Sequence, residues 1–446
     1  MRALGPGYSL GVSAVQNRAG APAGLSAKPV EEICREARLA SRVLARTPTG
    51  VKDAALEAIA GALEDRLPEI LAANELDMEA GREADIGEAL LDRLRLDDGR
   101  VRAIAAAVRQ IAALADPVGE VIDGGRLPNG LDVRKVRVPL GVVAVVYEAR
   151  PNVTIDAAAL CLKSGNAIVL RGSSTAAHSN LALARIASEA AVGAGLPAGC
   201  VSLVAGGGRE ELAELATQRE TVDLIIPRGG ESLKEALQAV ATVPVVYAAS
   251  GNCHVFVDAA ADLEQALAIV LNAKLQRPGV CNAAETLLVH EAIADRFVPV
   301  VAEALSEAGV TLRADEHAHA LAAPAAGERA EQAAEHDWAT EYLGPTLAVG
   351  IVSSVDEAIE HISRYGSGHS EAIVTLDAAS ARAFQLGIDA ACVYVNASTR
   401  FTDGGEFGMG AEIGNSTQKL HARGPIGLRE LCTFKYLVEG DGHVRA

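Results

Sequence analysis

The hydrophobic and polar positions of the chain change their rhythm near residue 140. From Val30 to Ala115, Ala, Leu and Ile recur at spacings of three and four residues with charged residues between them, which is typical of amphipathic helices. From Gly141 onward, short apolar runs alternate with helical stretches. The run Val142 to Tyr147 is nearly continuous in β-branched residues and predicts a strand that is buried on both faces, as in a parallel sheet.

Strand, turn and helix follow one another four times in the first half of the chain. The expected strands cover residues 142–147, 167–171, 201–204 and 222–226, and each leads through a turn into a helix. Because parallel strands need crossover connections, this repetition predicts a doubly wound parallel sheet. The second half repeats the pattern and predicts a second α/β domain, with strands at residues 254–257, 286–289, 347–352, 372–375 and 393–395.

A hairpin is expected between the helical region and the first strand of this sheet. Residues 131–138 alternate between apolar and polar side chains, as a half-buried strand does, and Pro128-Asn129-Gly130 is a turn signal before them. A hairpin between larger units often projects and pairs with another segment. We therefore predict an oligomerisation arm and a homo-oligomer, with the run Cys432 to Val438 as a candidate partner strand.

The composition of the 446 residues excludes several classes of protein. A formal net charge of −18 and an aromatic content of 3% argue against nucleic-acid binding, which needs a basic surface and stacking side chains. An anionic substrate must therefore be met by a local basic pocket. No run of eighteen apolar residues exists, so no membrane span is expected. Residues 1–28 lack the apolar core of a secretory signal and are interpreted as a disordered leader.

The seven cysteines are scattered and never spaced as Cys-x-x-Cys. Neither a disulfide framework nor a zinc site is expected from such a pattern, and no other metal site is predicted. The cysteine usage fits a reducing compartment, so the expected location is cytoplasmic.

Cys281 is the one cysteine placed like a nucleophile, on a tight loop between a helix and a strand. Pro278 and Gly279 end the helix-like stretch 262–276, and a β-run follows soon afterwards. Backbone N–H groups of the loop and the Arg277 side chain are expected to lower the pKa of the thiol, and the thiolate is the reactive form. The alternative is a buried cysteine that packs as a small hydrophobic residue.

Three glycine-rich turns follow strands of the first sheet: Arg171-Gly-Ser-Ser174, Gly206-Gly-Gly208 and Arg228-Gly-Gly230. Nucleotides bind at this edge of doubly wound sheets, where glycine lets the backbone approach a pyrophosphate and helix N-termini favour negative charge. None of the turns is a Gly-x-Gly-x-x-Gly or phosphate-loop motif, and an ordinary βα turn is the alternative for each. Their common position indicates a dinucleotide site.

Other polar residues are candidates for contact with the substrate. The Asn152 amide follows the first buried strand and could donate to an oxyanion at Cys281, together with the backbone N–H of that cysteine. The alternative for this asparagine is a helix cap or a turn. Lys163, Lys419 and Arg423 could hold a phosphate or a carboxylate, although solvation at the surface is the commoner fate of such side chains.

Several stretches of the chain match motifs of a known family: Val138-Pro-Leu-Gly141, Tyr147-Glu-Ala-Arg-Pro-Asn-Val153, Leu162-Lys-Ser-Gly-Asn166, Leu170-Arg-Gly-Ser173, Gln276-Arg-Pro-Gly-Val-Cys-Asn282, Gly410-Ala-Glu-Ile-Gly414 and Ser416-Thr-Gln-Lys-Leu-His-Ala-Arg-Gly-Pro425. In these motifs the chain resembles the gamma-glutamyl phosphate reductases, which are glutamate-5-semialdehyde dehydrogenases within the aldehyde dehydrogenase superfamily. The motifs are long and are spread from about Val30 to Val438, so chance is a poor explanation.

The resemblance implies an activity and an architecture. The implied reaction is the NADPH-dependent reduction of L-glutamyl 5-phosphate to L-glutamate 5-semialdehyde and phosphate through a cysteine thioester, the second step of proline biosynthesis from glutamate. The implied fold is α/β and aldehyde-dehydrogenase-like, with two doubly wound parallel-sheet domains and a β-hairpin oligomerisation arm. Glutamate 5-kinase is a candidate partner besides the small-molecule substrate. The expected division is a dinucleotide-binding domain at 29–118 and 141–249, a catalytic domain at 250–425, and the arm at 119–140 and 426–446.

The resemblance also assigns roles to residues that match the motifs. Cys281 is implied as the nucleophile, and Asn152 lies near the oxyanion-donating asparagine of the superfamily. Arg171 stands where a lysine contacts the adenosine ribose, and Glu341 matches the glutamate that holds the nicotinamide ribose. The expected cofactor-binding set is Arg171, Gly172, Ser173, Ser174, Gly206, Gly229 and Glu341, and the expected substrate-binding residues are Lys419 and Arg423.

Two departures from the superfamily pattern bear on the chemistry. Members that prefer NAD usually have a glutamate three residues after the lysine, and this chain has Ser174 there, which leaves room for the 2′-phosphate of NADP beside Arg171. Oxidative members carry a glutamate that activates water, and the matching place near Tyr247 has no carboxylate, which suits a reductase. The alternatives are an oxidative aldehyde dehydrogenase and a nucleotide-sensing or scaffolding protein with a dead site.

Overall fold

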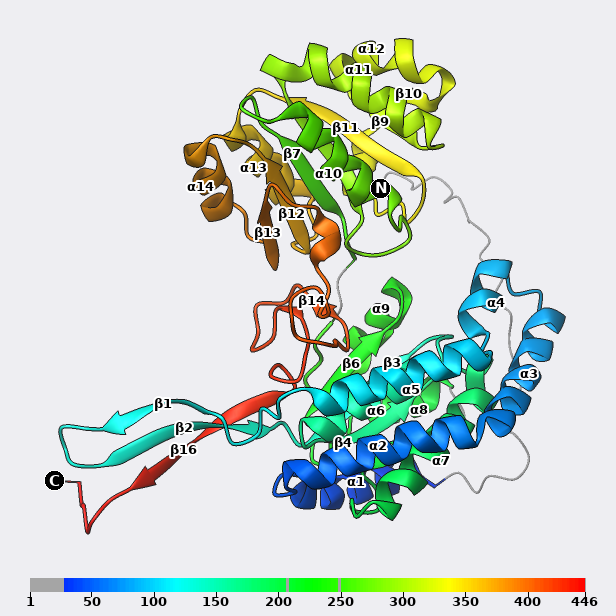
Figure 1. The fold of residues 1–446 in the computed structure, drawn as a ribbon, viewed down its shortest axis with the longest axis vertical. Coiled ribbons are helices and arrows are strands. Elements are labelled where there is room, and N and C mark those ends of the chain that lie inside the picture. Colours follow the sequence, from blue (N-terminus) through cyan, green and yellow to red (C-terminus); the bar gives the residue numbers. More distant parts are fainter. Residues whose placement is uncertain (1–27, 206–207, 248–249, 446) are drawn as a thin grey trace, which may run out of the picture.

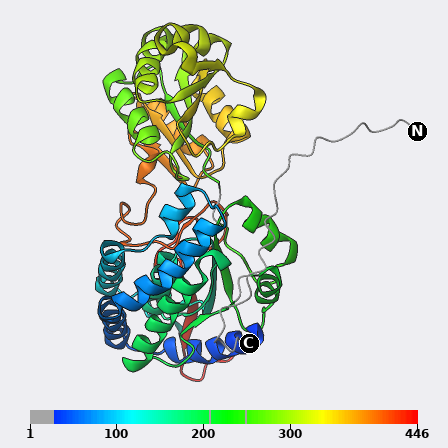
Figure 2. The same ribbon diagram turned by 90° about the vertical axis from the view of Figure 1, so that its right-hand side faces the viewer.

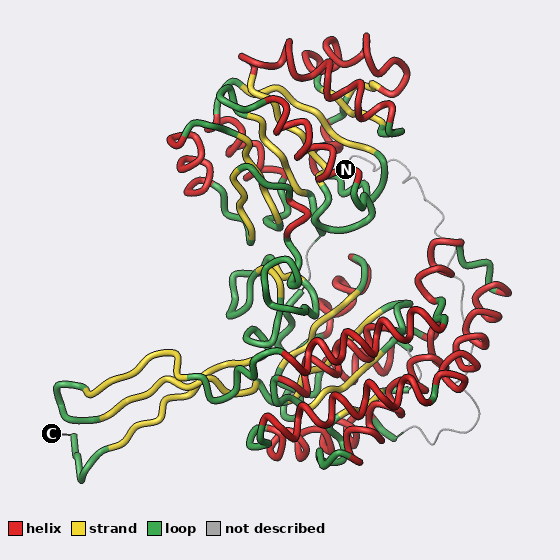
Figure 3. Tube along the Cα trace, in the orientation of Figure 1, coloured by secondary structure: helices red, strands yellow, loops and turns green. Residues whose placement is uncertain are grey.

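The computed structural model describes residues 28–205, 208–247 and 250–445, so the predicted leader at 1–28 lies outside the described residues except for its last position. Two α/β units lie one above the other in Figure 1, and a long arm projects from the lower unit. The same arrangement is seen from the side in Figure 2. Figure 3 shows that the connections between the two units are mostly loops.

The lower unit begins with five helices, where helical spacing predicts them. They are α1 (Val30–Leu44), α2 (Thr49–Asp65), α3 (Leu67–Glu83), α4 (Glu88–Leu94) and α5 (Asp98–Ala113). Some of their boundaries have a clear local cause. Asp97 caps α5, because its side chain accepts a hydrogen bond from the backbone N–H of Arg100.

A four-stranded sheet forms the centre of the lower unit. Its strands are β3 (Val142–Tyr147), β4 (Ala167–Arg171), β5 (Val201–Leu203) and β6 (Leu224–Arg228), parallel and in the order β5-β4-β3-β6. Its helices are α6 (Asn152–Lys163), η1 (Ser174–Ala176), α7 (Ala177–Gly193), α8 (Arg209–Ala216) and α9 (Glu231–Val240). All six residues of β3 are buried, as the β-branched run predicts. This confirms the predicted doubly wound sheet.

The upper unit contains a larger parallel sheet, of the order β10-β9-β11-β8-β7-β12-β13. Its strands are β7 (Cys253–Val257), β8 (Ala284–His290), β9 (Thr311–Ala314), β10 (Ala330–Gln332), β11 (Thr346–Val352), β12 (Ser370–Val374) and β13 (Cys392–Val395). Its helices are α10 (Leu263–Leu275), α11 (Glu291–Glu307), α12 (Glu316–Ala326), η2 (Gly327–Arg329), η3 (Glu335–Ala339), α13 (Val355–Tyr365), α14 (Ala378–Gly387) and η4 (Thr399–Phe401). Sequence reasoning misses β9 and β10, which have only four and three residues.

The arm is a three-stranded antiparallel sheet, in the order β1-β2-β16. The hairpin strands are β1 (Val121–Arg126) and β2 (Asp132–Pro139), and β16 (Cys432–Glu439) pairs with β2 over its whole length. The predicted hairpin and its C-terminal partner strand are therefore confirmed. The arm exposes apolar side chains on a structure that has little core of its own: Val121, Ile122, Phe434, Tyr436 and Val438.

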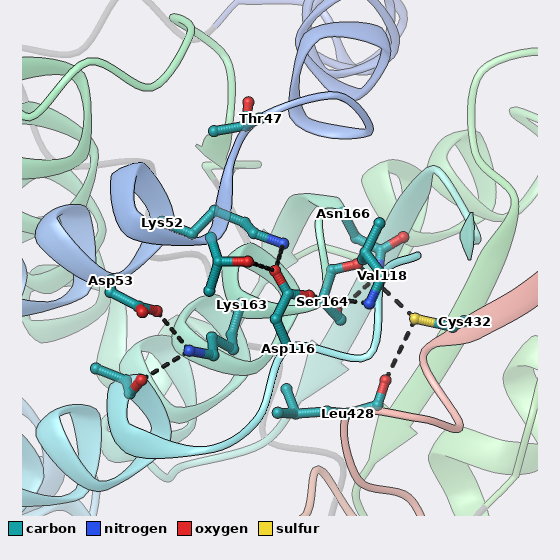
Figure 4. A network of polar contacts seen from close by, with 12 residues as sticks. Thr47, Lys52, Asp53, Asp116, Val118, Lys163, Ser164, Asn166, Leu428 and Cys432 are labelled. Carbon is teal, nitrogen blue, oxygen red and sulfur yellow. Dashed lines mark hydrogen bonds and ion pairs between the residues drawn. The ribbon is translucent and has the colours of Figure 1, made fainter. Parts of the chain in front are cut away.

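A buried polar network anchors the root of the arm to the lower unit (Figure 4). The Lys52 ammonium group of α2 is fully buried and lies 2.5 Å from the carboxylate of Asp116, just before the arm begins. The Asn166 amide donates a hydrogen bond of 2.8 Å to the carbonyl of Leu431, just before β16. Buried charges are stable only when they are paired, so this network fixes where the arm leaves the domain.

The chain returns from the upper unit along residues 396–431, a segment that includes β14 (Asn415–Ser416) and β15 (Gly424–Pro425). Ile413, Ala422 and Ile426 on this segment are buried in the hydrophobic core of the lower unit. The range 250–425, which we assign to a catalytic domain, thus ends in a segment that packs against the other domain. This return brings polar residues of the segment to the boundary between the two units.

Candidate active site

Cys281 lies on the loop between α10 and β8, close to where the chain crosses between the two units. It is partly exposed, whereas the other six cysteines are buried. The carbonyl of Cys281 accepts a weak hydrogen bond of 3.2 Å from the thiol of Cys253 at the start of β7. The side chain is therefore not an inert member of a core, which was the alternative interpretation.

Gly251 packs directly against the backbone of Cys281. A Cβ atom added to Gly251 would lie 1.5 Å from the carbonyl oxygen of Cys281 and 2.3 Å from its carbonyl carbon. Contacts this short are impossible, so any side chain at residue 251 must displace the nucleophile loop. The backbone N–H of Gly251 donates a hydrogen bond of 2.6 Å to the carboxylate of Glu341. Glu341, the predicted ribose-binding residue, thus also holds the segment before β7 that packs against Cys281.

A buried ion pair supports the loop that carries Glu341. The ammonium group of Lys274 lies 2.5 Å from the carboxylate of Glu285, and both side chains are fully buried. The other oxygen of Glu285 accepts a hydrogen bond of 3.1 Å from the backbone N–H of Leu343, a residue with φ of 52°. Burial raises the pKa of Glu285 to about 7, against the opposing effect of Lys274.

Replacing Lys274 by methionine is expected to lower the free energy of unfolding by about 3–5 kcal/mol, because Glu285 would be left buried without a counter-charge. The double variant Lys274→Met/Glu285→Leu should be more stable than the single variant, because it removes both charges. Urea unfolding of the full chain, followed at the transition of the catalytic unit, measures the free energy of unfolding of both variants. A single variant within about 1 kcal/mol of the parent protein would contradict this role of the pair.

The electrostatic environment of the Cys281 thiol differs from the prediction. Burial raises the pKa of the thiol above its ordinary value, and the carboxylates of Glu341 and Glu412 add to this effect. The cation that opposes the rise is Arg228, from the end of β6 in the other unit. The sequence predicts a lowered pKa for the Cys281 thiol, with Arg277 as the cation responsible. Both parts are wrong: the net shift is upward, and the cation that opposes it is Arg228.

Asn152 is the first residue of α6, after the elbow that follows β3. Its amide nitrogen donates a hydrogen bond of 2.9 Å to the carboxylate of Asp156. Burial raises the pKa of Asp156 to about 6, while Asn152 and Arg228 act in the opposite direction. An amide group carries two N–H donors, so the contact with Asp156 orients the group and leaves one donor for a ligand. No hydrogen bond among the described residues joins Asn152 to Cys281.

The predicted cofactor residues that the structure describes lie at the carboxyl edge of the first sheet, except Glu341, described above. Arg171 ends β4, and its guanidinium group donates a hydrogen bond of 2.6 Å to the carbonyl of Gly208. A side chain at Gly172 would collide with the Asn180 amide at 2.0 Å, and one at Gly229 would meet Glu148 at 2.8 Å. A side chain at either glycine would therefore force these neighbouring side chains to move. Ser174 is exposed at the start of η1, and Gly206 lies outside the described residues.

The basic side chains proposed for substrate binding are engaged elsewhere in this structure. Lys419 and Arg423 both form ion pairs with Asp389, before β13. Lys163 is buried and pairs with Asp53 of α2, so its role is structural (Figure 4). Substrate binding by Lys419 and Arg423 stays a prediction.

Sequence reasoning does not single out Gly251, Glu285, Arg400 and Glu412, and it marks Arg228 only as part of a glycine-rich turn, not as a cation that acts on Cys281. Arg228 and Glu412 stand inside stretches that the sequence does mark, beside Gly229-Gly230 and within Gly410–Gly414. A buried lysine–glutamate pair and a glycine forced by contact with a distant loop have no local sequence signal, because both depend on tertiary packing.

Comparison with known proteins agrees with this architecture. The model of the aldehyde dehydrogenase family matches residues 14–337 and 332–435. A curated gamma-glutamyl phosphate reductase from Moorella thermoacetica is 56% identical over 411 residues, which are 92% of this chain and 97% of the relative. One from Thermobifida fusca is 54% identical over 94% of this chain and 99% of the relative. The chain belongs to the gamma-glutamyl phosphate reductase family.

A solved structure of the same family supports the fold. The crystal structure of gamma-glutamyl phosphate reductase from Thermotoga maritima superposes with a TM-score of 0.91 at 47% sequence identity, and the match covers 94% of this chain and 100% of that one. The aldehyde-dehydrogenase-like fold with two doubly wound domains is therefore confirmed.

Members of the aldehyde dehydrogenase family use a nicotinamide cofactor, and the turns of this reductase-family chain fit one. The hydroxyl oxygen of Ser173 is buried at the end of β4 and has no hydrogen-bond partner among the described residues. A buried hydroxyl without a partner is costly, and a cofactor phosphate or ribose would satisfy it. The glycine turns beside it let a ligand approach the backbone closely.

Two kinds of site are missing from the described part of the chain. None of its helices combines the length and the apolar character that crossing a membrane requires. Nor does it bring together three or more His, Cys, Asp or Glu side chains in an arrangement that could hold a metal ion.

Proposed function

We propose that this protein catalyses the NADPH-dependent reduction of L-glutamyl 5-phosphate to L-glutamate 5-semialdehyde and phosphate, the second step of proline biosynthesis from glutamate. The observation that carries the proposal is the placement of Cys281: a partly exposed thiol beside the domain crossing, in a chain that shares more than half of its residues with named gamma-glutamyl phosphate reductases.

The chain supplies the groups for acyl transfer. In the proposed first step the thiolate of Cys281 attacks the acyl carbon, the C–S bond forms, and the C–O bond to phosphate breaks. The free N–H of the Asn152 amide and the backbone N–H of Cys281 stabilise the oxyanion that forms in between. Phosphate leaves with the electron pair of the broken bond, so no general acid is required.

The cofactor residues have separate tasks in this proposal. Bound NADPH supplies the hydride that converts the thioester to the aldehyde. The backbone at Gly172 and Gly229 and the Ser173 hydroxyl bind its phosphates, and Glu341 binds the nicotinamide ribose. The region near Tyr247 offers no carboxylate for activating water: the backbone N–H of Tyr247 donates to the side chain of Gln418. This favours the reductase over an oxidative aldehyde dehydrogenase.

The assay that tests the function follows NADP reduction with pyrroline-5-carboxylate, the cyclised product, in the reverse direction. We expect no steady-state turnover without phosphate and saturable turnover with it, because phosphate must take the acyl group from the cysteine. Steady oxidation of the aldehyde in phosphate-free buffer would instead identify an oxidative aldehyde dehydrogenase.

The choice of NADP over NAD is proposed to depend on Arg171 and Ser174. Replacing Ser174 by glutamate is expected to raise KM for NADPH about tenfold or more and to change KM for NADH much less, because a carboxylate would repel the 2′-phosphate. Ser174→Ala is the matched control and should keep the parent preference. An unchanged ratio of the two constants in the glutamate variant would place the discrimination elsewhere.

We also propose that the arm joins copies of the chain into a homo-oligomer. Phe434, Tyr436 and Val438 on β16 are about half exposed, and β1 and β16 leave two unpaired strand edges. The variant Tyr436→Asp/Val438→Asp is expected to lower the mass found by analytical ultracentrifugation to that of one chain. Leu386 on α14 is also exposed, so Leu386→Asp is the control for the effect of adding a charge to the surface away from the arm. An oligomer that resists the arm variant would contradict the role of the arm.

A further inference from the structure

Four arginine side chains gather around the nucleophile loop, two from each unit. In the lower unit, Arg150 follows β3 and Arg228 ends β6. In the upper unit, Arg277 lies just after α10 and Arg400 lies on η4. Burial lowers the pKa of both Arg150 and Arg400, and neighbouring cations add to the effect: Arg228, Arg93 and Arg277 for Arg150, and Arg277 for Arg400. Within the part of the chain that the structure describes, none of the four forms an ion pair.

This cluster contrasts with the rest of the molecule. The chain has a net charge of −18, and many of the other arginines in its described part lie against carboxylates, as Arg109 does with Glu64 at 2.7 Å. Carboxylates lie near the cluster, because Glu148 acts on Arg150, Asp403 on Arg400, and Arg228 on Asp156 and Glu412, but none of them pairs directly with these arginines. Cations held together without a direct partner repel one another in the free protein, and an anionic ligand relieves that repulsion. The arrangement therefore points to a bound anion at the nucleophile.

Arg400 is held rigidly beside Cys281. Its guanidinium group donates a hydrogen bond of 2.8 Å to the side chain of Gln276, at the end of α10. Its carbonyl accepts a bond of 3.3 Å from the amide of Asn282, the residue after the nucleophile. The hydroxyl of Thr399 donates in turn to the carbonyl of Asn282 at 2.7 Å. These contacts fasten η4 across both ends of the nucleophile loop.

Arg228 approaches the nucleophile from the other unit. It ends β6, directly beside Tyr147 of β3 in the sheet register. Its guanidinium group lies against Gly414 of the returning segment, where an added Cβ atom would be 2.5 Å from a guanidinium nitrogen. The absence of a side chain at Gly414 thus gives the guanidinium group its place. The charge of Arg228 is felt by Cys281, by Asp156 and by Glu412.

We propose that Arg228 and Arg400, one from each unit, bind the phosphoryl group of the acyl phosphate. The inference rests on the proposed function. The phosphoryl group is attached to the carbon that Cys281 attacks, whereas the amino acid carboxylate lies at the other end of the substrate. A guanidinium group presents a planar fork of donors that suits phosphate oxygens. As the C–S bond forms and the C–O bond breaks, the electron pair leaves on the phosphate oxygen, and the two arginines stabilise the developing charge.

A direct test measures alkylation of Cys281 in the full chain by iodoacetate, an anion, and by neutral iodoacetamide, with the modified peptide identified by mass spectrometry. We expect Arg228→Gln and Arg400→Gln each to lower the iodoacetate-to-iodoacetamide rate ratio about tenfold, because each removes a charge near the thiol. Inorganic phosphate should slow alkylation of the parent protein and protect the two variants less. Arg313→Gln, which removes an arginine paired with Glu331 on the edge of the upper sheet, is the control.

Steady-state kinetics of the reverse reaction provide the second readout. KM for phosphate is expected to rise about tenfold in either glutamine variant, while KM for pyrroline-5-carboxylate changes less than about twofold. A rise confined to the pyrroline-5-carboxylate constant would overturn the inference and assign the arginines to the carboxylate. Unchanged alkylation ratios and unchanged phosphate constants would also overturn it, while leaving the reductase activity in place.

The two proposals fail in different ways. If the enzyme needed no phosphate for turnover, yet phosphate still protected Cys281 through both arginines, the reductase function would be contradicted and the anion site would stand. Arg228→Lys and Arg400→Lys separate charge from geometry. They are expected to restore the alkylation ratio but only part of the affinity for phosphate, because lysine keeps the charge and lacks the fork.

Discussion

Cys281→Ser is expected to lower the rate of reduction by about 10³-fold or more while leaving NADPH binding nearly unchanged. The serine hydroxyl has a much higher pKa than a thiol and gives an ester where the thioester would form, so both formation and reduction of the acyl-enzyme are slowed. The effect should fall on kcat. Cofactor affinity, measured by fluorescence titration, should stay within about threefold, because the proposed cofactor-binding groups do not include the Cys281 thiol.

The control for this experiment is a cysteine with no chemical role. Cys200 is fully buried just before β5, at the edge of the first sheet, and burial raises its pKa to about 11. Cys200→Ala should retain most of the activity. A Cys281→Ser enzyme that kept most of the parent rate would remove Cys281 from the chemistry.

Gly251→Ala is expected to lower kcat about 10²-fold with little change in cofactor affinity. The new methyl group would occupy the position of the Cys281 carbonyl, so the nucleophile loop must shift by an ångström or more. The same shift weakens the hydrogen bond from the residue 251 N–H to Glu341. The rate of Cys281 alkylation should change as well, which distinguishes a displaced loop from a lost cofactor contact.

Gly279→Ala is the matched control, because it places the same methyl group on the loop between α10 and β8 that carries Cys281. Its nearest neighbour would be the carbonyl of Leu343 at 3.6 Å, an ordinary contact. We expect this variant to keep activity within about threefold of the parent. Equal losses of kcat in the two variants would mean that an added methyl group near Cys281 is harmful wherever it is placed. The specific contact between Gly251 and Cys281 would then not explain the effect.

Most of the fold follows from the sequence because its elements carry strong periodic signals. The buried run of β3 and the strand β16 match their expected limits within a residue or two. The short strands β9 and β10 are missed because three or four residues carry no period and are defined by pairing with β11 and with each other. The return of residues 411–426 to the first core is also invisible in the sequence, since it depends on packing between distant segments.

The site is only partly predictable for the same reason. The position of Cys281 on a helix–loop–strand connection follows from Pro278 and Gly279, and its partial exposure agrees with that. Its electrostatic environment does not follow, because the decisive cation, Arg228, comes from a strand about fifty residues earlier. Residues near in sequence, such as Arg277, are poor guides to charge in a site assembled from two domains.

The most direct measurement of the central claim is a single-turnover experiment without phosphate. The protein is mixed with NADP and pyrroline-5-carboxylate in phosphate-free buffer, and NADPH formation and the mass of the Cys281 peptide are followed together. The account predicts a burst of about one NADPH per chain and a glutamyl adduct on Cys281. When phosphate is then added, the adduct should be released and turnover should continue. A burst without any adduct on Cys281, or continuous turnover in the absence of phosphate, would contradict it.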